Sequence, residues 1–208
     1  EILRCLVGSE MCIRDRNKVV FVESNPAWVK CGLSQKSLGP VLSPLLRFFV
    51  VETPAPGLSS RSIPVSEYGW DTPWRKPQYL NKKLKAASSN KSLYWAAAAV
   101  GDMEQALRNA DLFDCAGIES KPFESAVFYD AKSNQTLSLF YHLRNGFAHG
   151  RFCAFKSKGD VWFAIEDVAG KRKNDPAGDI KRLTARILIK NSTLCKWMKL
   201  IKDGPGVR

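Results

Sequence analysis

The chain has 208 residues, of which 45% are hydrophobic and 25% are charged, so its composition is typical of a globular protein and excludes a fibrous or fully disordered one. Its 32 lysine and arginine residues outnumber the 20 acidic residues, and the net charge of +12 favours polyanionic partners. The longest apolar run, from Val41 to Val51, is much shorter than the roughly 20 residues that cross a bilayer. We therefore expect no membrane span.

The first residues are expected to be an artefact. The stretch from Leu6 to Arg16, LVGSEMCIRDR, resembles the in-frame translation of a sequencing-library adapter. On this resemblance the chain is an open reading frame from shotgun sequencing, and residues 1–16 take no part in the fold. We expect the native N-terminus to be missing.

The cysteines after residue 16 do not form a recognisable site. They are separated by 84, 38 and 42 positions, with no CxxC pair and no Cys/His cluster at metal-ligand spacing, and they are Cys31, Cys115, Cys153 and Cys195. We interpret them as reduced core thiols of a cytoplasmic protein that binds no metal and needs no cofactor.

Residues 17–80 are expected to be an irregular N-terminal segment of unknown role. Seven of the eleven prolines in the chain lie between positions 40 and 77, and this density argues against long helices there. The exceptions that we expect are a short strand at Lys18–Val22 and a short apolar element near Leu42–Val51.

Residues 81–204 are predicted to form a mainly α-helical domain, a bundle with one inserted β-hairpin. Apolar residues at helical spacing from Leu93 to Ala110, behind an N-cap at Asn90, predict the first helix. A second helix is expected to begin near Ser133 or Asn134 and to end at Gly150.

The rest of this domain is predicted to be a hairpin followed by helix. Aromatic and β-branched residues at 152–155 and 161–165 flank a turn-forming run and predict the hairpin. Asp175-Pro176 then predicts the start of one long helix, or of two helices broken around residues 191–193. The pair Gly204-Pro205 ends this helical stretch.

The second predicted helix carries the residues that point to chemistry. Arg144 lies in its apolar stripe, where a guanidinium needs a compensating partner. Asn145 and His149 share a face at i and i+4, and His142 precedes Asn145 on that face. A fixed cation, an amide and an imidazole that transfers protons near neutral pH are the groups that can cleave a phosphodiester without a metal. Gly146, in mid-helix, indicates that another backbone or a ligand comes close.

At this helix the sequence resembles the HEPN superfamily, all-helical domains whose ribonucleases carry Arg, usually a polar residue, and then His. Residues 139–152, LFYHLRNGFAHGRF, are similar to the motif helix of small plasmid-borne and mobile-element members. The likeness is weaker over residues 161–167 and 182–201, and it covers about residues 90–202 in all.

The resemblance implies a metal-independent endoribonuclease that acts as a toxin or a phage-defence effector, with an antitoxin or regulatory partner. His149 would transfer the proton, Arg144 would bind the phosphate, and Asn145 would orient either group. Because related nucleases join two motif helices across a twofold axis, we expect a homodimer. The residues expected to contact RNA are His142, Arg151, Lys171, Arg172 and Lys173.

Other interpretations remain open at this point. Arg144 could bridge to Glu104 or Asp111 on the first helix, and His149 could stabilise a helix C-terminus, which would make the motif purely structural. The chain would then be a non-catalytic HEPN-like module that binds nucleotide or RNA, or that scaffolds a partner. A helical DNA-binding protein is a third interpretation, although no recognition-helix pattern is visible.

Overall fold

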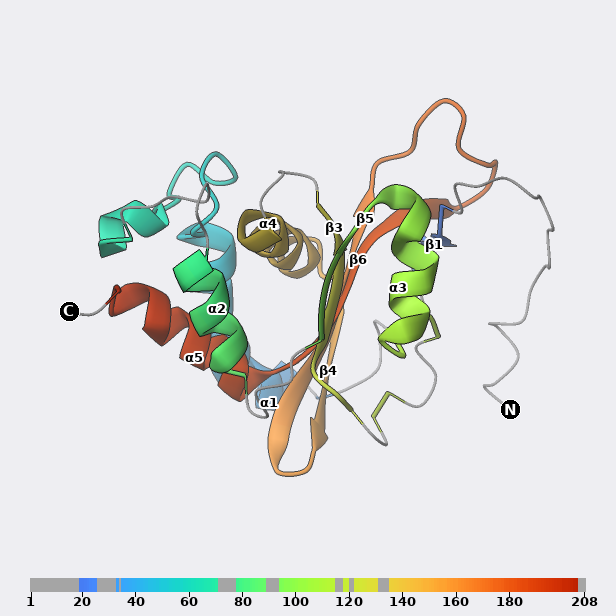
Figure 1. The fold of residues 1–208 in the computed structure, drawn as a ribbon. Coiled ribbons are helices and arrows are strands. Elements are labelled where there is room, and N and C mark those ends of the chain that lie inside the picture. The colour runs from blue at the N-terminus through green and yellow to red at the C-terminus, as the bar shows by residue number, and fades with distance from the viewer. Residues whose placement is uncertain are drawn as a thin grey trace.

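The computed structural model describes residues 19–25, 33, 35–70, 78–88, 94–114, 118–119, 122–130 and 135–205. Within these ranges a central sheet is covered on both faces by helices (Figure 1). One face carries α1 (Gln35–Leu46), α2 (Gln78–Ala86), α4 (Gln135–Ala148) and α5 (Asn191–Lys202), and the other carries α3 (Met103–Asn109). This is an α/β fold, so the predicted mainly α-helical, all-α bundle is wrong.

The sheet is mixed, and its middle strand is β6 (Ile180–Lys190). The strand order is β2-β3-β6-β5-β4, and β1 also pairs with β6. β5 pairs with one edge of β6. On the other edge, β3 pairs with the C-terminal part of β6 and β1 pairs with its N-terminal part. β2 and β3 are parallel, and the other pairs are antiparallel. The remaining bounds are β1 Phe21–Glu23, β2 Tyr94–Ala98, β3 Ser125–Tyr129, β4 Phe152–Ser157 and β5 Asp160–Ala169.

Both faces of the sheet are apolar, so the protein has two core layers. Alternate residues of β5 serve the two layers: Phe163 packs with Phe140 and Trp197 beneath the helices α4 and α5, whereas Trp162 packs with Leu107 beneath α3. A strand that is buried on both faces has a nearly continuous apolar sequence rather than an alternating one.

This double burial explains two wrong helix predictions. Residues 94–98 form β2, although four consecutive alanines favour helix, because the segment pairs in parallel with β3. Residues 180–190 form β6 rather than helix: Ile180, Leu183 and Ile187 match helical spacing, but Leu183 and Ile187 belong to the core layers on different faces of the sheet. The helical part of that stretch is confined to α5.

The N-terminal segment is more ordered than predicted. β1 shares only Phe21 and Val22 with the expected strand at Lys18–Val22, and α1 contains both Pro40 and Pro44. The helix continues into a π-helical turn, η2 (Arg47–Val51), and a 3-10 turn, η3 (Val65–Tyr68), follows. Phe48 and Phe49 of η2 are buried in the same core as Phe140, and this burial offsets the cost of the prolines.

Several elements confirm the sequence-based predictions. β4 and β5 form the expected hairpin around residues 158–159, and α4 is the second predicted helix. The first predicted helix survives as the 3-10 turn η4 (Val100–Asp102) and α3, while its N-cap at Asn90 lies outside the described residues. None of the helices in the described ranges has the length and apolar character needed to cross a bilayer.

Candidate functional site

The motif residues lie in the last two turns of α4 and the turn that follows it. Gly150 adopts a left-handed conformation, with φ of 65°, and so ends the helix as predicted. The backbone N–H of His149 donates to Asn145 O at 2.9 Å, and that of Arg151 donates to Gly146 O at 2.9 Å. These bonds satisfy the last carbonyl groups of the helix and fix the position of His149 relative to Asn145.

Gly146 is a point of very close contact between α4 and the sheet. A Cβ atom at this position would lie within 3.0 Å of Cγ2 of Ile165 and 3.1 Å from the carbonyl oxygen of Glu166. The close neighbour that the sequence predicted is therefore β5, and the end of α4 is held directly against this strand.

His142 is buried, with 1% of its surface exposed. Its Nδ1 lies 2.7 Å from Oδ2 of Asp167, and its Nε2 lies 2.8 Å from the carbonyl oxygen of Tyr129. His142 was predicted to contact RNA, but the structure places it in the interior with both ring nitrogens engaged.

Asn145 and Arg144 continue this set of hydrogen bonds toward the surface. Nδ2 of Asn145 donates to the same Oδ2 of Asp167 at 3.3 Å, and a terminal nitrogen of Arg144 donates to Oδ1 of Asn145 at 3.1 Å. Both side chains are half-buried. α3 lies on the opposite face of the sheet, where Glu104 pairs with Arg108, so Arg144 is not bridged to the first predicted helix.

His149 is exposed at the end of α4. Within the described part of the chain its imidazole makes no hydrogen bond or ion pair, in contrast to that of His142. The sequence contains two histidines, so His149 is the one that solvent can reach. The structure thus brings a guanidinium, an amide and a free imidazole to one helix end.

Arg151 was also expected to contact RNA, but it is buried. Its guanidinium binds Glu166 of β5 and the carbonyl oxygens of Glu23 and Ser24. Glu166 is fully buried and also accepts from Nε of Arg186 at 2.9 Å. Arg151 therefore takes part in an internal ion-pair cluster on the α3 side of the sheet.

The three basic residues expected to bind RNA, Lys171, Arg172 and Lys173, are exposed in the loop between β5 and β6 (Figure 1). Lys171 Nζ donates to Gly178 O at 3.0 Å, which holds the loop partly closed. Lys171 lies four residues after Asp167, so the chain can separate the two by about 14 Å at most. The loop thus starts near the strand that supports α4.

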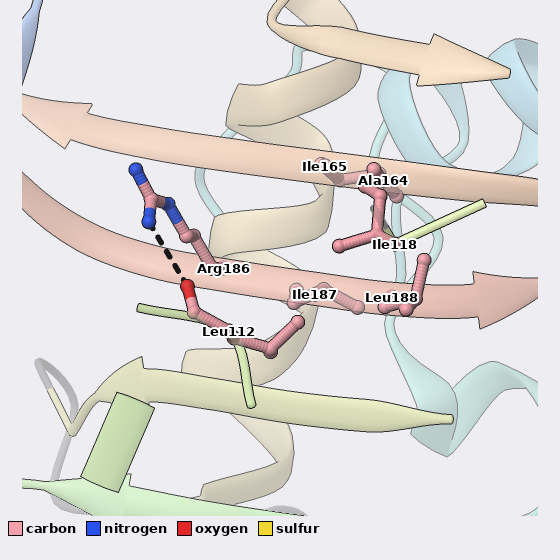
Figure 2. Close-up of a pocket in the computed structure, with 7 residues that line it drawn as sticks. All are labelled: Leu112, Ile118, Ala164, Ile165, Arg186, Ile187 and Leu188. Atoms are coloured by element: carbon pink, nitrogen blue, oxygen red, sulfur yellow. Dashed lines mark hydrogen bonds between the residues drawn. The ribbon is translucent and has the colours of Figure 1, made fainter. Parts of the chain in front are cut away.

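A small pocket lies on the other side of the sheet (Figure 2). Its walls are mainly aliphatic side chains of Leu112, Ile118, β5 and β6, and Arg186, which also lines it, donates to Leu112 O at 2.9 Å. The cavity volume of about 10 Å³ corresponds to about one water molecule. This space is too small for a substrate.

Asp167 is the site residue that sequence reasoning missed. It lies at a β-bulge between β5 and β6 and turns toward α4, whereas the preceding Glu166 faces α3. The signal in the sequence was the pair of adjacent acids, Glu166 and Asp167, at the end of an apolar strand. Both carboxylates need partners once the strand is buried, so one of them could be expected to bind the motif helix. In the described ranges, no group of three or more His, Cys, Asp or Glu side chains could hold a metal ion.

Comparison with known proteins found no matching family model, no matching curated protein and no matching solved structure.

Proposed function

We propose that this chain is a metal-independent endoribonuclease of the cytoplasm, with its site at the C-terminal end of α4. The observation that carries the proposal is that exposed His149 directly follows α4, whose last turns carry half-buried Arg144 and Asn145, while His142 is enclosed. A proton-transfer group and a phosphate-binding group are thus both reachable by a polyanion at one point of a strongly basic protein.

The proposed reaction is an internal transesterification of RNA. The 2'-hydroxyl attacks the adjacent phosphorus, its proton passes to a base, and the bond from phosphorus to the 5'-oxygen breaks. The leaving oxygen takes a proton from an acid, so the products are a 2',3'-cyclic phosphate and a free 5'-hydroxyl. Arg144 is suited to bind the phosphate oxygens, since its planar fork of donors matches them and stabilises the charge that develops.

His149 supplies one imidazole, but the reaction needs both a base and an acid. His142 cannot be the second, because it is buried and lies seven residues away, about 10.5 Å along the helix axis. We therefore include a homodimer in the proposal, in which two α4 ends meet and each contributes His149.

The similarity of α4 to the HEPN motif helix supports the residue roles, although the α/β fold differs from the helical bundle that this similarity implied. A role as a toxin or phage-defence effector, restrained by an antitoxin or regulatory partner, belongs to the same proposal. The exposed residues Lys171, Arg172 and Lys173 provide a basic loop that could hold the RNA backbone.

The test is incubation of single-stranded RNA with the purified full chain in the presence of EDTA. We expect cleavage with cyclic-phosphate ends, and a loss of at least about a hundredfold in rate for His149→Ala or Arg144→Ala. Lys199→Ala is the matched control, because it removes an exposed positive charge from α5 and should leave the rate unchanged. An RNA with a 2'-deoxy nucleotide at the cleaved position should resist cleavage, because it lacks the attacking hydroxyl.

RNA binding without cleavage would contradict the ribonuclease and support a non-catalytic RNA-binding module. The bond between Arg144 and Asn145 is what favours this second function, since it engages part of the motif internally. Cleavage that persists in His149→Ala would also contradict the proposed site.

A further inference from the structure

A continuous series of hydrogen bonds leads from the interior of the sheet to the motif. It runs from Tyr129 O through His142, Asp167 and Asn145 to the guanidinium of Arg144, with donor–acceptor distances between 2.7 and 3.3 Å. We infer that His142 and Asp167 form a buried support that positions Asn145 and Arg144. The inference rests on the proposed function, since Arg144 is there the phosphate-binding residue.

The hydrogen-bond partners of His142 and Asp167 define this support. Tyr129 O can only accept, so Nε2 of His142 donates to it. Oδ1 of Asp167 accepts the backbone N–H of Val168 at 2.9 Å, and Oδ2 accepts from Asn145. Nδ1 of His142 lies 2.7 Å from the same Oδ2, so the imidazole and the carboxylate share a hydrogen bond. Both ring nitrogens of His142 are thus engaged, and His142 and Asp167 form a buried, hydrogen-bonded pair.

Besides attaching α4 to the sheet, His142 and Asp167 also fix the orientation of the Asn145 amide. Oδ2 of Asp167 is shared by His142 and Asn145, so the Asn145 amide can turn only if this carboxylate moves. That orientation presents Oδ1 of Asn145 to Arg144. Nε of Arg144 is shielded from solvent, and in the described part of the chain no group accepts from it, so the terminal contact to Asn145 orients the guanidinium. His142 and Asp167 are thus positioning residues, and they need not touch RNA.

The decisive variant is Asp167→Asn, which keeps the size of the side chain but replaces the shared acceptor by an amide. The readout is the Nε–H signal of Arg144 in nitrogen-15 NMR spectra of the full chain, assigned with Arg144→Lys. Ser138→Ala is the matched control, because it removes a part-buried 2.7 Å bond to Asp130 from the same helix, and Ser138 is not a partner in any of the four bonds of the series.

We expect the Arg144 signal to shift and its exchange with water to accelerate in Asp167→Asn, and to stay unchanged in Ser138→Ala. For RNA cleavage, Asp167→Asn should lower kcat by at least about tenfold with little change in KM, because misplacement of Arg144 acts on the transition state. An unchanged Arg144 signal in folded Asp167→Asn would overturn the inference.

A second measurement needs no substitution in the support. The chain has two histidines, so its ring-nitrogen spectrum contains two sets of signals, and His149→Ala assigns them. Nε2 of His142 should carry a proton that exchanges slowly with water, and an unprotonated Nε2 would contradict its bond to Tyr129 O. A wild-type chain that cleaves no RNA would end the proposed function, whereas the support is decided by these spectra alone.

Discussion

Gly39 in α1 and Gly146 in α4 both lie inside helices, but their surroundings differ. A Cβ atom on Gly39 would meet nothing within 4 Å, whereas one on Gly146 would press into Ile165 and the Glu166 carbonyl. Glycine costs a helix roughly 1 kcal/mol relative to alanine, so its presence at 146 is explained by packing.

Gly146→Ala is therefore expected to lower the free energy of unfolding by about 1–3 kcal/mol, as overpacked sites do, despite the better helix propensity of alanine. Gly39→Ala should instead raise it by roughly 0.5–1 kcal/mol. Urea unfolding of the two variants beside the wild type measures both changes. A Gly146→Ala chain as stable as the wild type would show that α4 does not lie against β5 in this way.

At the level of elements, the adjacent acids Glu166 and Asp167 tie β5 to different partners. Asp167 holds α4 on one face of the sheet. On the other face Glu166 joins Arg151, which precedes β4, to Arg186 of β6, and Arg186 also donates to the carbonyl oxygens of Leu112 and Phe113 after α3. One buried carboxylate thus links three segments that are far apart in the sequence.

Glu166→Gln should destabilise the protein by about 3–5 kcal/mol, because it leaves buried guanidinium groups without their anion. The comparison is Glu104→Gln, which disrupts the surface pair with Arg108 in α3 and should cost less than about 1 kcal/mol. Denaturant midpoints of the two variants give the difference. Similar losses for both would mean that the buried cluster contributes no more than a surface pair.

Local signals predicted the elements that are formed by local interactions. Gly150 ended α4, and the turn between β4 and β5 defined the hairpin. The strands β2 and β6 could not be predicted in this way, because their apolar patterns are set by burial on two faces rather than by helical periodicity. In the same way, the positions of Arg144, Asn145 and His149 on one helix end followed from sequence, but Asp167 required the fold to bring β5 beneath α4.

At the scale of the whole molecule, the two faces of the sheet differ in how their charged groups are placed. On the α3 side, charged groups are enclosed and satisfied around Glu166. On the α4 side, the hydrogen-bonded series ends at half-buried Arg144, and His149 remains exposed. A single chain therefore presents the guanidinium of Arg144 and the imidazole of His149 at the end of α4, and the proposed transesterification needs a second proton-transfer group besides this imidazole.

If two protomers complete one site, a mixture of wild-type and His149→Ala chains should lose activity faster than its wild-type fraction. Co-expression of the two chains in equal amounts, followed by random pairing, leaves about one quarter of the dimers with both imidazoles. Independent sites would leave about one half of the activity. Cleavage rates of the mixture decide between these values, and native mass spectrometry checks that the chains pair. Activity proportional to the wild-type fraction, or a chain that stays monomeric while it cleaves RNA, would contradict the shared site.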